Sequence, residues 1–141
     1  MERRRFEIER KVLAEHLGEN LFKFFNVDSK DTYVEMCART NRGNIYTLHA
    51  ELANFPFDIP RVYVKRMLAD RDGNALDTPS GAMHVLASKN GWTRICHYGS
   101  SSWTPHVSIF KVFMKCRLWL EMYELHLQTG RPIDFYLNHQ E

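Results

Sequence analysis

The chain has 141 residues, of which 44% are hydrophobic and 26% are charged, so it can bury one sizeable core, and a single domain over residues 1–141 is expected. Its formal net charge of +2 is too small to predict a nucleic-acid partner. No apolar run approaches the roughly 20 residues of a membrane helix and the N-terminus has no secretory signal pattern, so we expect no membrane association and a cytoplasmic location.

The first predicted element is a helix over residues 2–18, where good helix formers dominate and apolar residues recur at helical spacing. Its first turn is basic, with Arg3, Arg4 and Arg5 in succession. Such a cluster forms either a solvated helix face or a docking surface for an acidic partner. The sequence leaves both interpretations open.

The next part of the chain predicts an antiparallel β-meander of about four strands. Residues 33–38 and 45–52 alternate between apolar and polar side chains, and the turn-forming residues 41–44 separate them. Residues 61–65 form a further predicted strand, which follows a connection made rigid by two prolines.

The second half of the chain predicts loops followed by helices. Residues 68–82 are rich in turn formers, and residues 83–96 are expected to be irregular. From residue 106 to residue 127 the apolar side chains recur on one face, which predicts a long helix. Residues 132–139 predict a short last helix. The order of elements indicates an α+β fold with an irregular loop before the C-terminal helices.

The three cysteines differ in their surroundings. They are odd in number and form no C-x-x-C pair, which argues against a disulfide framework and suits a reducing cytoplasm. Cys37 lies in a predicted strand and Cys116 lies on the apolar stripe of the long helix, so both are expected in the core. Cys96 lies in a loop-rich stretch between Arg94 and His97, where positive charge and partial exposure would favour a reactive thiolate.

Three segments resemble motifs of ubiquitin-conjugating-enzyme-like (UBC-like) domains, in the order and with the spacing found in that family. They are residues 55–64 (FPFDIPRVYV), residues 90–96 (NGWTRIC) and residues 103–112 (WTPHVSIFKV). The likeness covers about residues 44–125. The end of the long helix, WLEMYELHLQTG, resembles prokaryotic members of the family that occur with antiphage (CBASS-like) operons.

The resemblance implies that Cys96 is the nucleophile of an acyltransferase that needs no cofactor. His84 matches the histidine of the family's His-Pro-Asn motif, but the Pro-Asn that should follow is absent, and Asn90 is only a loose substitute for the missing oxyanion donor. We expect His84 to brace the loop. His97 or His106 is a candidate base or electrostatic partner.

The family also implies supporting residues and partners. Trp103 and Pro105 are expected to shape the loop under the cysteine, and the Arg3–Arg5 cluster becomes a candidate docking site for an activating enzyme. The expected modifier carries a C-terminal glycine and is either a ubiquitin-like protein or a cGAS-like nucleotidyltransferase. It would be supplied by an activating enzyme or as a pre-activated partner.

Three other functions stay open at the level of sequence. A non-catalytic UBC-like or RWD-type binding module would have the same fold but no acyltransferase activity. A metal site could use His84, Cys96, His97 and His106, but their spacing fits no compact zinc signature, so no metal is predicted. A cysteine hydrolase would need a His/Asp partner pair that the sequence does not assign.

Overall fold

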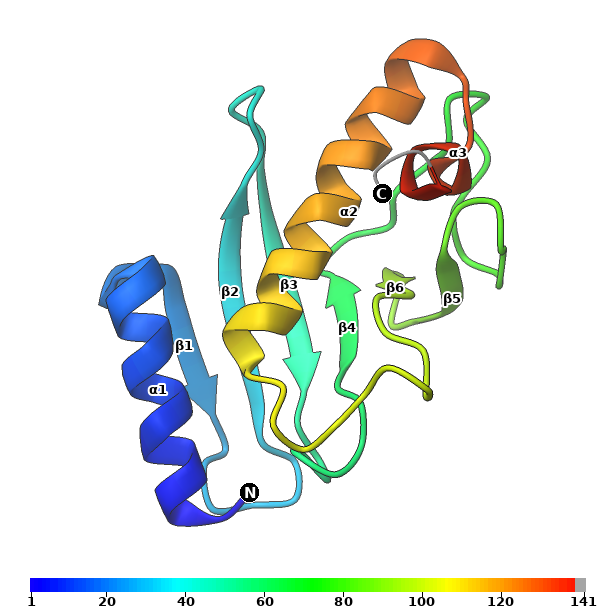
Figure 1. The fold of residues 1–141 in the computed structure, drawn as a ribbon. Helices are drawn as coiled ribbons and strands as arrows, with labels where there is room; N and C mark the ends of the chain where they lie inside the picture. The colour runs from blue at the N-terminus through cyan, green and yellow to red at the C-terminus, as the bar shows by residue number, and fades with distance from the viewer. Residues whose placement is uncertain (139–141) are drawn as a thin grey trace.

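The computed structural model describes residues 1–138 and has an α+β architecture in which three helices accompany one sheet (Figure 1). The helices are α1 (Arg3–Leu17), α2 (Ile109–Thr129) and α3 (Ile133–Asn138), with a single 3-10 turn, η1 (Glu19–Leu21), after α1. The predicted helices are thus present, with ends shifted by one to three residues. Position 139 of the last predicted helix lies outside the described residues.

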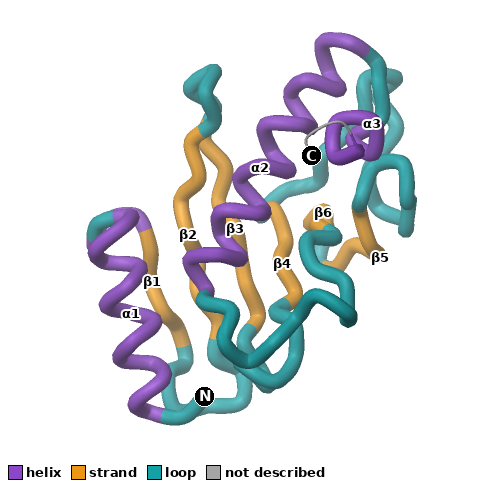
Figure 2. The backbone as a smooth tube through the Cα atoms, viewed as in Figure 1, coloured by secondary structure: helices purple, strands orange, loops and turns teal. Residues whose placement is uncertain are grey.

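The sheet has six antiparallel strands, not the expected four. They are β1 (Phe22–Phe25), β2 (Tyr33–Arg39), β3 (Ile45–Glu51), β4 (Arg61–Val64), β5 (Val85–Lys89) and β6 (Trp92–Ile95). Their order is β1-β2-β3-β4-β6-β5, so that the last hairpin adds to the sheet through its second strand. Figure 2 shows the loops that surround this last hairpin.

The hairpin of β5 and β6 occupies most of the segment that was expected to be irregular. Its two-residue turn is Asn90-Gly91, and both residues have positive φ, 56° and 75°, as a type I′ turn requires. Asn-Gly is the strongest short sequence signal for this turn. The two strands give a weak apolar pattern in the sequence, because β5 buries only Val85 and one of the two buried residues of β6 is the polar Thr93.

Helix α2 crosses one face of the sheet, and the core lies between the two (Figure 1). The helix begins at the N-cap Ser108, whose hydroxyl accepts a hydrogen bond from the Lys111 amide at 3.1 Å. It ends at Gly130, which adopts a left-handed conformation with φ 77°. Helix α1 lies beside β1 at one end of the sheet, and α3 packs on α2 at the other. In residues 1–138, no helix combines the length and apolar character needed to cross a bilayer.

Candidate functional site

Cys96 directly follows β6, so the sheet fixes the start of the candidate site. Its amide donates a hydrogen bond to the carbonyl of His84 at 2.9 Å, which extends the hairpin pairing by one residue. The Cys96 side chain is half-buried. Cys116, by contrast, is fully buried under the sheet, and burial raises the pKa of its thiol well above the usual value. Cys37 is half-buried on β2 and lines no pocket with another candidate residue.

A pocket of about 400 Å³ opens beside Cys96, within the range of about 300–1,000 Å³ that is usual for ligand sites. Two walls come from α2 and α3. The residues that share the pocket with Cys96 include His84, Lys115, Leu118, Trp119, Met122 and Leu137. Trp119 and Met122 are almost completely buried, whereas Leu118 keeps 37% of its surface exposed. The thiol therefore borders a hollow whose floor is apolar.

His84 lies beside Cys96 and contacts both its backbone and helix α3. Its backbone is held in the left-handed region at φ 49°, which is uncommon for a residue other than glycine. Its Nε2 atom lies 2.8 Å from the Asp134 carboxylate on α3, and its carbonyl accepts from the Cys96 amide. The adjacent Met83 carbonyl accepts a hydrogen bond from the Trp119 indole at 3.1 Å. His84 thus ties α3 to the backbone of the candidate nucleophile, and the adjacent Met83 ties α2 to the same segment.

His97 is half-buried, with its Nε2 atom fully buried, and it is uncharged near neutral pH. Burial lowers its pKa to about 4, because the imidazolium would lose its hydration, and the nearby charge of Arg94 acts in the same direction. Nδ1 of His97 lies 3.4 Å from the carbonyl of Ile95, and within residues 1–138 its buried Nε2 has no hydrogen-bond partner. A neutral ring supplies no positive charge to a thiolate.

The cation that the structure does place in this pocket is Lys115, which sequence reasoning missed. Its ammonium lies 4.1 Å from the centre of the Tyr98 ring, close enough for a cation–π contact. Lys115 is exposed on the outer side of α2. Lysines are common at such positions, so the sequence pattern does not indicate that this one has a function. Only the packing of α2 against the cysteine segment brings it to the pocket.

Asn90 is separated from Cys96 by the whole length of β6. It occupies the hairpin turn, and at about 3.3 Å per residue the two positions are roughly 15–20 Å apart. Asn90 lines a different hollow, together with His49 and Trp92. The expectation that its side chain could replace the missing asparagine of the family motif is therefore wrong in this structure.

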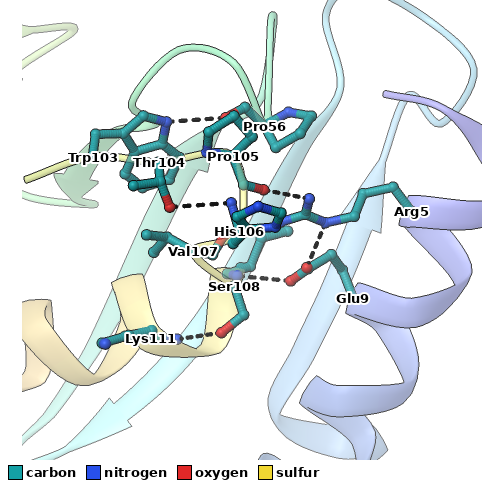
Figure 3. Close-up of polar contacts among 11 residues, drawn as sticks. Arg5, Glu9, Pro56, Trp103, Thr104, Pro105, His106, Val107, Ser108 and Lys111 are labelled. Carbon is teal, nitrogen blue, oxygen red and sulfur yellow. Dashed lines mark hydrogen bonds and ion pairs between the residues drawn. The ribbon is translucent and has the colours of Figure 1, made fainter.

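Trp103 and Pro105 hold the loop that returns from Cys96 to α2 (Figure 3). The Trp103 indole donates a hydrogen bond to the carbonyl of Pro56 at 3.0 Å, and its ring meets Phe55 and Tyr98 edge-on. The carbonyl of Pro105 accepts a hydrogen bond from helix α1. Both residues therefore anchor the loop to other parts of the fold, and their role in supporting an active site stays a prediction.

The hydrogen bond to Pro105 comes from a pair of α1 side chains, Arg5 and Glu9, here called the α1 clamp (Figure 3). Arg5 donates to the Pro105 carbonyl at 2.6 Å, to the Val107 carbonyl at 3.0 Å and to the Glu9 carboxylate at 2.8 Å. Glu9 is almost completely buried. Its other carboxylate oxygen accepts a hydrogen bond at 2.7 Å from the amide of Ile109, in the first turn of α2.

The α1 clamp changes the interpretation of the basic cluster Arg3–Arg5. Arg5 is engaged within the molecule and is not available to a docking partner, whereas Arg3 and Arg4 are exposed. Arg3 lies 3.5 Å from both Glu7 and Asp28, in pairs that are open to solvent. The sequence could not reveal the clamp, because Glu9 and Ile109 are 100 positions apart.

His106 is exposed near the clamp and does not line the pocket of Cys96 (Figure 3). Of the four residues weighed as metal ligands, His84, Cys96 and His97 line one pocket and His106 does not. In the part of the chain that the structure describes, no three His, Cys, Asp or Glu side chains gather in a way that could hold a metal ion. Comparisons with protein-family models, with curated proteins and with solved structures found no match to this chain.

Proposed function

We propose that this chain is a UBC-like acyl carrier in which Cys96 holds the C-terminal glycine of a protein modifier as a thioester and passes it to an amine. The observation that carries the proposal is the position of Cys96. It is a half-exposed thiol at an apolar pocket, on a backbone held by β6, in the segment whose sequence resembles the family's cysteine motif. The other two cysteines lack such a position.

The proposed chemistry needs two exchanges at one carbonyl carbon. The Cys96 thiolate attacks the glycine carbonyl of an activated thioester, a new C–S bond forms, and the donor thiol leaves with the electron pair of the bond that breaks. An amine then attacks the Cys96 thioester, the C–N bond forms and Cys96 leaves as thiolate while the amine loses a proton. A thiol suits both steps, because it is a good nucleophile and a good leaving group.

The role of each neighbour follows from its contacts. His84 holds the Cys96 amide through its carbonyl, which makes it a positioning residue. Lys115 brings a positive charge to the pocket and would favour the developing oxyanion. His97, neutral and with its Nε2 atom buried, would shape the loop and take no part as a base.

The proposed partners are those that the resemblance to UBC-like proteins implies. An activating enzyme, or a pre-activated partner, would supply the modifier, which is either a ubiquitin-like protein or a cGAS-like nucleotidyltransferase, in a bacterial antiviral defence system. Arg3 and Arg4 on the exposed side of α1 are the candidate contacts to the activating partner.

The deciding experiment is intact-mass measurement under non-reducing conditions after co-expression with the proteins encoded beside this chain. Wild type is expected to carry a thiol-sensitive adduct, which Cys96→Ala loses and Cys96→Ser converts into a thiol-resistant ester. Cys37→Ser is the matched control, because this thiol is also half-buried but lines no shared pocket. An adduct that survives Cys96→Ala would contradict the proposal.

A second function, a non-catalytic binding module of the same fold, is favoured by one observation. Neither of the two side chains that the sequence offered for polar support of the reaction is placed to give it, since Asn90 lies at the far end of β6 and the Nε2 of His97 is buried. If co-expressed partners bind wild type and Cys96→Ala equally and no adduct forms, the binding module takes precedence.

A further inference from the structure

The pocket beside Cys96 is longer than a thiol requires. Its wall on α2 runs from Lys115 to Met122, which is two helical turns or about 10 Å. An extended peptide advances about 3.3–3.6 Å per residue, so this wall has the length of about three residues. The pocket can therefore hold a short stretch of chain attached to the sulfur.

The chemistry of this wall changes along its length. Lys115 is polar, whereas Leu118, Trp119 and Met122 are apolar, and Leu137 of α3 faces the same hollow. Trp119 and Met122 are each 2% exposed, so they form a fixed floor, while Leu118 stands at the edge with 37% of its surface in water. Exposed apolar surface of this kind gains free energy when another apolar group covers it.

We infer that the pocket selects a modifier whose C-terminal tail carries an apolar side chain within three residues of its terminal glycine. The glycine carbonyl is bonded to Cys96 in the thioester, which tethers the preceding residues beside the apolar wall. This inference rests on the proposed carrier function of Cys96 and names the class of tail that it would accept.

The inference is tested with peptide thioesters and the full chain, with no activating enzyme present. The host peptide is acetyl-Ser-Ser-Ser-Gly as its mercaptoethanesulfonate thioester, and leucine replaces each serine in turn. The Cys96 sulfur bonds to the glycine carbonyl carbon, and mercaptoethanesulfonate leaves as its thiolate. The rate of acylation is followed by intact mass, with Cys96→Ala as the background.

We expect leucine at one of the three positions to raise the acylation rate about 10- to 100-fold, the gain from burying one large apolar side chain. Leu118→Ser should remove most of this preference, measured within the variant as the ratio of the leucine-peptide rate to the all-serine rate. Leu127→Ser is the matched control, because Leu127 is 39% exposed on the same helix but does not line the pocket. It should keep the full preference.

The outcomes separate this inference from the proposed function. Equal rates for all four peptides, above the Cys96→Ala background, would overturn the apolar preference and leave Cys96 as an acyl carrier. A preference for leucine that Leu118→Ser and Leu127→Ser reduce alike would also overturn it. Acylation no faster than the Cys96→Ala background would remove the carrier role and the inference together.

Discussion

Cys96 joins two segments that are held in place by different kinds of interaction. Before it, β6 lies between β4 and β5, and backbone hydrogen bonds run along both of its sides. After it, residues 97–108, all of them described, contain neither helix nor strand. Side chains from elsewhere anchor this second segment, chiefly Arg5 at two of its carbonyls, with Glu9 at the first amide of α2.

The difference concerns how each segment responds to substitution. A backbone ladder depends on many main-chain groups, so changing one side chain removes little of it. The loop depends on a few side chains that come from distant parts of the sequence. We therefore expect single substitutions in α1 to disturb one side of Cys96 and to leave the other side intact. Four measurements test this contrast between the two segments.

The largest effect is expected at the α1 clamp. Glu9→Ala would leave the Arg5 charge, which is only 19% exposed, without its carboxylate, and would free the Ile109 amide. The free energy of unfolding should fall by about 3 kcal/mol in urea denaturation. Glu7→Ala, on the exposed side of the same helix, should cost at most about 0.5 kcal/mol. Equal losses for the two variants would show that the clamp is not an anchor.

The second effect depends on pH and belongs to His97 in the loop. Its pKa is about 4 in the folded chain against about 6.5 when unfolded, so the unfolded state binds more protons between these values. Stability should be full above pH 6.5 and fall by up to about 2–3 kcal/mol as the pH drops to 4. His97→Gln should lose this part of the pH dependence. If the slope of the unfolding free energy against pH is unchanged in that variant, a group other than His97 causes the pH dependence.

The third effect tests the hairpin side. Gly91→Ala puts a Cβ on a residue with φ 75°, and no atom lies within 4 Å of that Cβ, so the cost is one of backbone conformation alone. We expect a loss of about 1–2 kcal/mol. Gly81→Ala, equally uncrowded but without positive φ, is the control and should be close to neutral. The rate of Cys96 alkylation by iodoacetamide should stay the same in both.

The smallest effect is expected at Trp103. Trp103→Phe removes the hydrogen bond to the Pro56 carbonyl while keeping an aromatic ring against Phe55, at a cost of about 1 kcal/mol. Limited proteolysis between residues 97 and 108 should become faster. If this variant leaves proteolysis unchanged while Gly91→Ala accelerates it, the contrast between the two sides of Cys96 fails.

The sequence predicted the parts of the fold that repeat with a clear period. The α+β class, the long helix and β2, β3 and β4 follow from regular apolar spacing and are confirmed, with small shifts at their ends. Strand β1 was not predicted, because Phe22, Phe24 and Phe25 show no clean alternation. The β5–β6 hairpin was expected to be irregular, although its Asn-Gly turn is a strong signal, because its strands are short and bury few apolar residues.

The candidate site was predictable only in part. Cys96, His84, Trp103 and Pro105 could be found from their order along the chain, because each lies on a local motif. The pocket wall on α2, the α1 clamp and the isolation of Asn90 could not, since each depends on contacts between residues distant in sequence or on the length of a strand. Lys115 and Glu9 carry no local signal that separates them from ordinary charged residues on helix surfaces.

The order of the last two strands has a consequence for how motion reaches the thiol. The edge of the sheet is β5, while β6, which leads into Cys96, is an interior strand. Fraying begins where a strand has only one neighbour, so local unfolding at this end of the sheet begins with β5. The edge strand at this end of the sheet therefore carries no candidate nucleophile. When β5 opens, Arg94 and Ile95 keep their pairing to β4, while the Cys96 amide loses its hydrogen bond to the His84 carbonyl, so opening of the edge reaches the thiol through this one bond.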